Sequence, residues 1–271
     1  MVRDITLGQF MPGSSIIHRL DARTKLLLLI AIIVFIFAAN NYMSLLLITL
    51  ASLLVVLLTR ISFLLYLKSM KVILLVVVFT GIINLFYGSG EVLWEWQFIR
   101  ITEGGVNNAI FVTIRIATLV IVSSVLTFTT SPSDLTDGLE RLLSPLKVFH
   151  IKVHEIAMMM TIALRFIPVL LEETDKIMNA QKARGADMES GGLIKRVRAL
   201  IPVLIPLFVS SFRRANDLAM AMECRCYNGG KGRTRMNTPH FTHRDLLALI
   251  WLLIVFTGVI LCNIYFPATV R

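Results

Sequence analysis

Long uncharged runs of apolar residues recur along this chain, and their lengths predict helices that cross a membrane. A membrane span needs about 20 apolar residues. The uncharged run Leu26–Thr59 is too long for one span. A straight helix of that length would extend about 51 Å, whereas the hydrocarbon core is about 30 Å thick. The polar pair Asn40-Asn41 divides this run into two short spans. Further spans are predicted over Val72–Gly90, Val106–Phe128 and Leu246–Val270.

Backbone polar groups find no water in the hydrocarbon, so membrane-spanning segments of this kind are helices. The predicted fold class is therefore all-α, a polytopic membrane protein with about five transmembrane helices and a long helical cytoplasmic coupling region. Four parts are expected along the chain. They are a cytoplasmic N-terminal segment (1–25), transmembrane helices 1–4 (26–129), a cytoplasmic or interfacial coupling domain (130–244) and a C-terminal transmembrane helix (245–271).

Lysine and arginine predict the orientation, because short cytoplasmic segments of membrane proteins carry an excess of both. With the N-terminus inside, the inner segments hold 24 of the 27 Lys and Arg residues. Arg115 then lies within a span, and only Arg100 and Arg271 fall outside. The opposite orientation would place the 24 basic residues outside. We therefore expect a multi-pass protein with a cytoplasmic N-terminus and an external C-terminus.

The polar segment 130–244 is predicted to be helical. It begins with an amphipathic helix over Asp134–Leu143, which Pro145 ends. His154–Leu171 is apolar but interrupted by charges and a proline, so it is not a clear span. Ala199–Phe212 is uncharged but short, which fits a buried or interfacial helix better than a span. Each apolar stretch leads into a polar helix, and these polar continuations are Glu172–Lys182 and Arg213–Arg225.

Both polar helices end on an arginine between two small residues. The two ends are Ala183-Arg184-Gly185 and Cys224-Arg225-Cys226. A guanidinium stays charged and offers a planar fork of donors to a carboxylate on a partner. The alternative is an ordinary helix end, where a cation complements the helix dipole and glycine permits a left-handed cap. The repetition of this motif on two similar helices favours a pair of docking points.

Composition excludes several classes of function. Positive-inside topology and attraction to anionic lipid explain the net charge of +10, and no nucleic acid partner is expected. Cys224 and Cys226 offer two ligands, where a structural zinc site uses four, so neither a metal nor another cofactor is expected. The sequence has no phosphate-binding loop and no evident catalytic pair, so we do not expect an enzyme.

Three motifs carry a resemblance to a known family. The N-terminal stretch Gly8–Lys25 reads GQFMPGSSIIHRLDARTK, with Ala22 where many members have proline. Ala183-Arg184-Gly185 matches an Ala-Arg-Gly motif, and Cys224-Arg225-Cys226 keeps the arginine while replacing both flanks with cysteine. Together they resemble the transmembrane T component of energy-coupling factor transporters, the ABC-type vitamin and metal importers of prokaryotes. The N-terminal stretch is most similar to the shared-module group.

The resemblance implies a coupling subunit in a prokaryotic plasma membrane. Two cytosolic ATPase subunits would hydrolyse ATP, and the arginine tips of two crossed helices would dock in them. The movement would be transmitted to a small membrane S component that captures a vitamin or another micronutrient. The chain itself would be non-catalytic.

Three further residues are candidates for contact with the S component. Arg115 lies deep in a predicted span, where a charge is costly and normally faces protein or water. Its partner is expected to be Asn84, a backbone carbonyl or a group on the S component. Met158 and Met159 fall on a predicted coupling helix. They are either plain apolar filling or an adaptable surface, since methionine repacks easily.

Two other transporter classes remain as alternatives. A conventional ABC permease would form the substrate path itself, but it would normally expose one coupling helix rather than two arginine tips. A secondary transporter often has membrane-embedded repeats and broken spans, whereas the repeat here lies in the polar segment.

Overall fold

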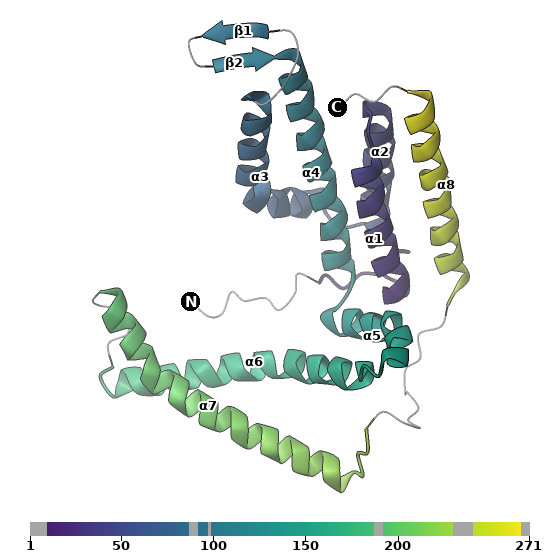
Figure 1. Cartoon of the computed structure of the whole chain (residues 1–271). Coiled ribbons are helices and arrows are strands. Elements are labelled where there is room, and N and C mark those ends of the chain that lie inside the picture. The colour runs from purple at the N-terminus through teal and green to yellow at the C-terminus, as the bar shows by residue number, and fades with distance from the viewer. Residues whose placement is uncertain (1–9, 87–91, 97–98, 187–191, 230–240, 267–271) are drawn as a thin grey trace. The chain divides into compact units, whose positions relative to one another are not determined.

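The computed structural model describes residues 10–86, 92–96, 99–186, 192–229 and 241–266 (Figure 1). The chain divides into two compact units. One comprises residues 8–138 and 238–271, and the other comprises residues 1–7 and 139–237. We call the first the membrane unit. The second contains most of the segment predicted to be the coupling domain, and we call it the coupling unit for that reason.

Five apolar helices build the membrane unit, which confirms the predicted all-α fold class. They are α1 (Ala22–Ala38), α2 (Tyr42–Thr59), α3 (Phe63–Phe86), α4 (Glu103–Thr129) and α8 (His243–Tyr265). By length and composition, α2, α4 and α8 can each cross a membrane, and α3 can if its two halves form one span. α1 has 17 residues, which is at the lower limit for a span.

The break between α1 and α2 falls at Asn41, as the sequence predicts. Asn41 caps α2, because its side chain accepts a hydrogen bond from the Ser44 N–H at 2.9 Å. Its amide nitrogen also donates to the carbonyls of Cys262 at 2.8 Å and Phe266 at 3.2 Å. The turn between the first two helices is thereby fixed to the end of α8.

The third helix and the loop after it differ from the prediction. α3 begins at Phe63 rather than Val72, and its two halves meet at an angle of 63°. Between α3 and α4 lies an antiparallel hairpin, with strands β1 (Val92–Trp96) and β2 (Ile99–Thr102). This stretch is rich in β-branched and aromatic residues, which favour strands.

Large apolar side chains fill the space between the helices of the membrane unit. One cluster of buried residues includes Ile36, Leu45, Ile48, Phe111 and Val259. A second cluster is built around Tyr66 and Phe128, whose rings meet edge to face. The opposite faces of the same helices are exposed and apolar, as expected for surfaces that contact lipid.

The start of α1 is held to the start of α8 by buried aspartates. Asp245, which is 1% exposed, accepts a hydrogen bond from the backbone N–H of Asp21 at 3.0 Å. It also accepts one from the Thr242 N–H at 2.9 Å, which caps α8. The first helix and the last described helix therefore begin side by side.

An ordered turn precedes α1. The His18 ring accepts a hydrogen bond from the Ser15 hydroxyl at Nδ1 and donates one from Nε2 to the Met11 carbonyl. Burial and the nearby charge of Lys25 lower the pKa of His18, against the opposing effect of the Met11 carbonyl. The lowered pKa favours the neutral imidazole, which can accept at Nδ1 while it donates from Nε2.

The coupling unit consists mainly of two long helices. They are α6 (Val153–Ala183) and α7 (Leu193–Cys224), and both are present as the sequence predicts. They follow α5 (Pro132–Leu142) and the short 3-10 helix η1 (Ser144–Phe149). The expectation for His154–Leu171 needs a correction. The helix runs through its charged and proline interruptions, and by length and composition α6 contains an apolar stretch that could cross a membrane.

Candidate functional site

The two arginine-tipped helices of the coupling unit contact each other and cross (Figure 1). Each is uninterrupted, although α6 contains Pro168 and α7 contains Pro202 and Pro206. α7 runs back across α6 in roughly the opposite direction, so their C-terminal ends lie at opposite ends of the pair. The two arginines are therefore presented at separate places.

The end of α6 has a Schellman-type geometry. Gly185 takes the left-handed conformation, with φ at 85°, as the sequence predicts. Its N–H donates to the Lys182 carbonyl at 3.0 Å, and the Ala186 N–H donates to the Gln181 carbonyl at 3.0 Å. Arg184 is the last residue before this reversal and sits at the helix C-cap.

The end of α7 repeats this geometry with cysteine in place of glycine. Cys226 takes the left-handed conformation, with φ at 55°. Its N–H donates to the Glu223 carbonyl at 2.8 Å, and the Tyr227 N–H donates to the Met222 carbonyl at 3.0 Å. A side chain in this conformation costs roughly 1–2 kcal/mol, so the geometry is kept here despite an unfavourable residue.

Both motifs are fully accessible. Ala183, Arg184 and Gly185 are exposed, and so are Cys224, Arg225 and Cys226. Within the described parts of the chain, neither guanidinium forms a hydrogen bond or an ion pair. Two unpaired planar donors at the tips of rigid helices are suited to bidentate binding of acceptors on another molecule.

One ion pair joins α6 to α7 at equivalent positions of the repeat. Arg214 donates a hydrogen bond to Glu173, and this contact lowers the pKa of the Glu173 carboxyl. Glu173 precedes Arg184 by 11 residues, and Arg214 precedes Arg225 by 11 residues. Each tip therefore lies about 16 Å along its helix from the pair. This ion pair was not predicted from the sequence, although Glu173 and Arg214 occupy matching positions when the two helices are aligned on their arginine motifs.

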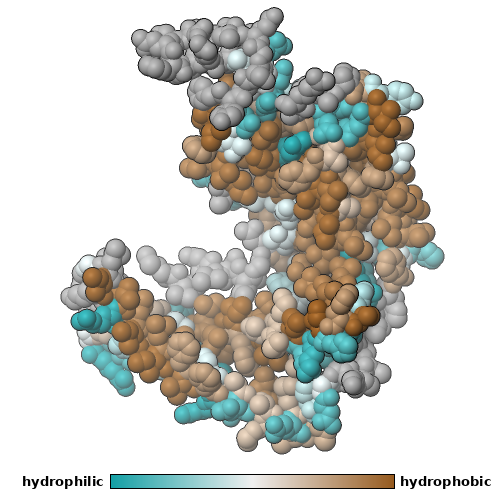
Figure 2. Space-filling view, in the orientation of Figure 1, coloured by the Kyte–Doolittle hydropathy of each residue, from teal (hydrophilic) through white to brown (hydrophobic). Residues whose placement is uncertain are grey.

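A stripe of exposed apolar side chains covers the middle of α7. Phe208 and Phe212 are 62% and 68% exposed. The stripe also includes Leu200, Ile201, Leu204, Ile205 and Val209, which recur at helical spacing. Apolar surface of this kind is visible on the coupling unit in Figure 2. Contiguous exposed apolar surface marks a site for protein or membrane contact.

The three remaining candidate residues lie in different units. In the membrane unit, Arg115 donates a hydrogen bond to the Ala39 carbonyl at 2.6 Å and lies over the Phe111 ring, 4.7 Å from its centroid. A backbone carbonyl is one of the three kinds of partner that the sequence predicts for Arg115. In the coupling unit, Met159 is 58% exposed and Met158 is half-buried. Their contact with an S component remains a prediction.

Known proteins are similar to this chain over nearly its whole length. A model of the CbiQ family, described as cobalt transport protein, matches residues 13–236. The energy-coupling factor transporter transmembrane protein EcfT of Ruminiclostridium cellulolyticum is 52% identical over 266 residues, which are 98% of this chain and 100% of that protein. The proteins of the same name from Clostridium kluyveri and Bacillus subtilis are 46% and 43% identical, over 98% and 94% of this chain and 99% and 97% of theirs.

Proposed function

Since this chain belongs to the CbiQ and EcfT family of transmembrane components of energy-coupling factor transporters, we propose that it couples two cytosolic ATPase subunits to a membrane S component. It is a multi-pass membrane protein and one component of a multi-subunit transporter. In this proposal, the partner subunits hydrolyse ATP in the cytoplasm of a prokaryote. The S component binds a vitamin or another micronutrient, and this chain transmits the movement between them.

The observation that carries the proposal is the pair of matching arginine tips. Arg184 and Arg225 have similar cap geometry, both are exposed, and they lie at opposite ends of a crossed pair of helices. Two separated and equivalent contact points suit two ATPase subunits better than one. The Glu173–Arg214 pair joins the two helices, so that displacement of one tip is transmitted to the other.

The apolar stripe on α7 is proposed to receive the S component. Its side chains are too exposed to be explained by packing within the coupling unit. Met159 on α6 adds an adaptable side chain to this unit. A conventional ABC permease remains the second candidate, but it would not require two arginine-tipped helices.

A test of the proposed function begins with purification of the tagged chain in mild detergent from its native cells. We expect two ATPase subunits and a small membrane protein to co-purify with it. After reconstitution, the complex is expected to take up a micronutrient only when ATP is supplied. Transport by this chain and the ATPases alone, without a small membrane subunit, would instead identify a permease.

The proposed orientation places the N-terminus and the coupling unit in the cytoplasm. It is supported by the basic segments and by the contacts that hold α1 and α8 parallel, with Asp21 beside Asp245 and Asn41 beside Phe266. Reporter fusions after Asn41 and Phe266 are expected to report an external location, and a fusion after Gly192 an internal one. An external reporter at Gly192 would mean that α6 crosses the membrane, contrary to the proposal.

A further inference from the structure

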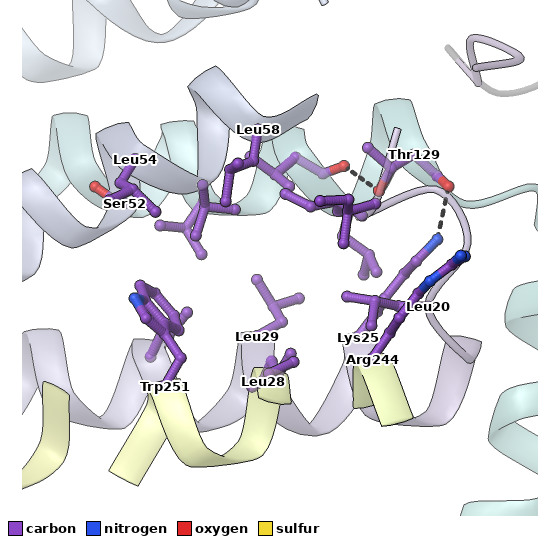
Figure 3. A pocket seen from close by; sticks show the side chains of 18 of the residues that line it. Leu20, Lys25, Leu28, Leu29, Ser52, Leu54, Leu58, Thr129, Arg244 and Trp251 are labelled. Atoms are coloured by element: carbon purple, nitrogen blue, oxygen red, sulfur yellow. Dashed lines mark hydrogen bonds between the residues drawn. The ribbon is translucent and has the colours of Figure 1, made fainter. Parts of the chain in front are cut away.

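A partly open cavity of about 350 Å³ lies within the membrane unit, among α1, α2, α4 and α8 (Figure 3). Its walls are almost entirely apolar and include Leu29, Ile32, Val55, Val122 and Trp251. Ligand pockets range from about 300 to 1,000 Å³, so the cavity is large enough to hold part of a small molecule.

Two basic side chains lie at one end of this cavity. Lys25 and Arg244 lie together there, beside Thr129 (Figure 3). The Lys25 ammonium donates to the carbonyls of Thr129 at 2.8 Å and His18 at 3.2 Å. The carboxylates of Asp21, Asp134 and Asp245 lie near this ammonium and offset its charge. Arg244 is exposed and has no hydrogen bond or ion pair with any residue that the structure describes. Its guanidinium is therefore available to an anion.

The place of Arg244 along α8, relative to the apolar lining of the cavity, indicates what kind of molecule fits. Arg244 lies in the first turn of α8, whereas Trp251 lies seven residues further along the same helix, or about 10 Å deeper. The ligand must therefore have an anionic head at the helix ends and an apolar tail within the bilayer. In the orientation proposed above, on which this inference partly rests, the head would lie in the cytoplasmic leaflet, where anionic lipids attract basic residues.

We propose that this cavity binds an anionic glycerophospholipid, with an acyl chain between the four helices and its phosphate at Arg244. An acyl chain matches the apolar walls of the cavity. A zwitterionic lipid would fill the same space, but it would leave the charge of Arg244 without a net counter-charge. The proposal therefore predicts selectivity for the headgroup as well as burial of the tail.

Trp251 gives a direct readout, because it lines the apolar part of the cavity. The full chain is prepared with Trp94→Phe and Trp96→Phe, which leaves Trp251 as its tryptophan. Its fluorescence is then titrated in mixed micelles with phosphatidylglycerol or phosphatidylcholine carrying bromine on the acyl chain. We expect brominated phosphatidylglycerol to quench at a clearly lower mole fraction. Arg244→Gln is expected to weaken its apparent affinity roughly fivefold, since one basic residue near the membrane surface contributes about that much.

Arg19→Gln is the matched control, because Arg19 is an exposed arginine in the same unit that does not line the cavity. This variant should keep the preference for phosphatidylglycerol. Ala248→Phe, which fills the cavity without changing a charge, should reduce quenching by both lipids.

Equal quenching by the two lipids in the parent chain would overturn the proposal. If quenching were lost only when an S component is added, the cavity would belong to a protein partner. That result would also overturn the lipid proposal. The measurement needs no ATPase and no known orientation, so its failure is distinct from failure of the coupling function.

Discussion

A chain carrying Arg184→Glu together with Arg225→Glu is expected to lose its ATPase subunits during purification, and with them ATP-driven uptake. Both arginines are exposed helix caps, so the membrane protein itself should fold and insert. Removing one partner of a buried, hydrogen-bonded charge pair costs roughly 2–5 kcal/mol. Each glutamate would also place a negative charge where an acceptor group is proposed.

Either substitution alone should have a smaller effect than the pair. One intact tip holds the partner at a high effective concentration for the rest of the interface, so a fraction of the complex should survive purification. Arg→Lys at both tips should restore binding only in part, because an ammonium cannot make the planar two-pronged contact.

Arg165→Glu with Arg213→Glu is the matched control for the double substitution. These arginines are also exposed and also lie on α6 and α7, so the change in net charge is identical while both tips remain intact. We expect this variant to retain the ATPases. Retention of both ATPase subunits by the Arg184 and Arg225 double variant would reduce these residues to ordinary helix ends.

Phe111→Ala is expected to cause the largest loss of stability in the membrane unit. Phe111 has no exposed surface, and its ring packs edge to face on Tyr42, with centroids 5.4 Å apart, and beneath the Arg115 guanidinium. Truncating a buried phenylalanine costs about 3–5 kcal/mol, because it leaves a cavity. Thermal unfolding in detergent should therefore show a clearly lower midpoint, and expression in the membrane should fall.

Phe37→Ala is the corresponding control, since Phe37 is 61% exposed on α1 of the same unit. It removes the same atoms from a surface that contacts lipid rather than protein, so the unfolding midpoint should change little. Similar midpoints for the two variants would mean that the Phe111 site collapses without a cavity.

Features that depend on local composition followed from the sequence. The uncharged runs identify helices because hydrocarbon leaves backbone groups no partner outside the segment. The break at Asn40-Asn41 followed from the length of the uncharged run, which exceeds one span. The ends of the two polar helices followed from their last residues, because capping preferences act within a few residues. The hairpin between β1 and β2 was missed, because a short alternating stretch beside a predicted span reads equally well as a loop.

Features that depend on long-range contacts required the tertiary structure. The partner of Arg115 is the Ala39 carbonyl, which is 76 residues away in sequence, and nothing in the neighbourhood of either residue distinguishes it from Asn84. Local sequence likewise does not reveal that Glu173 pairs with Arg214, or that Lys25 and Arg244 line the same end of one cavity. Hydropathy and charge are properties of each segment and can be read along the chain. Which segments lie together depends on how side chains pack across helices. This packing places Arg244, which has no partner among the described residues, beside an apolar cavity.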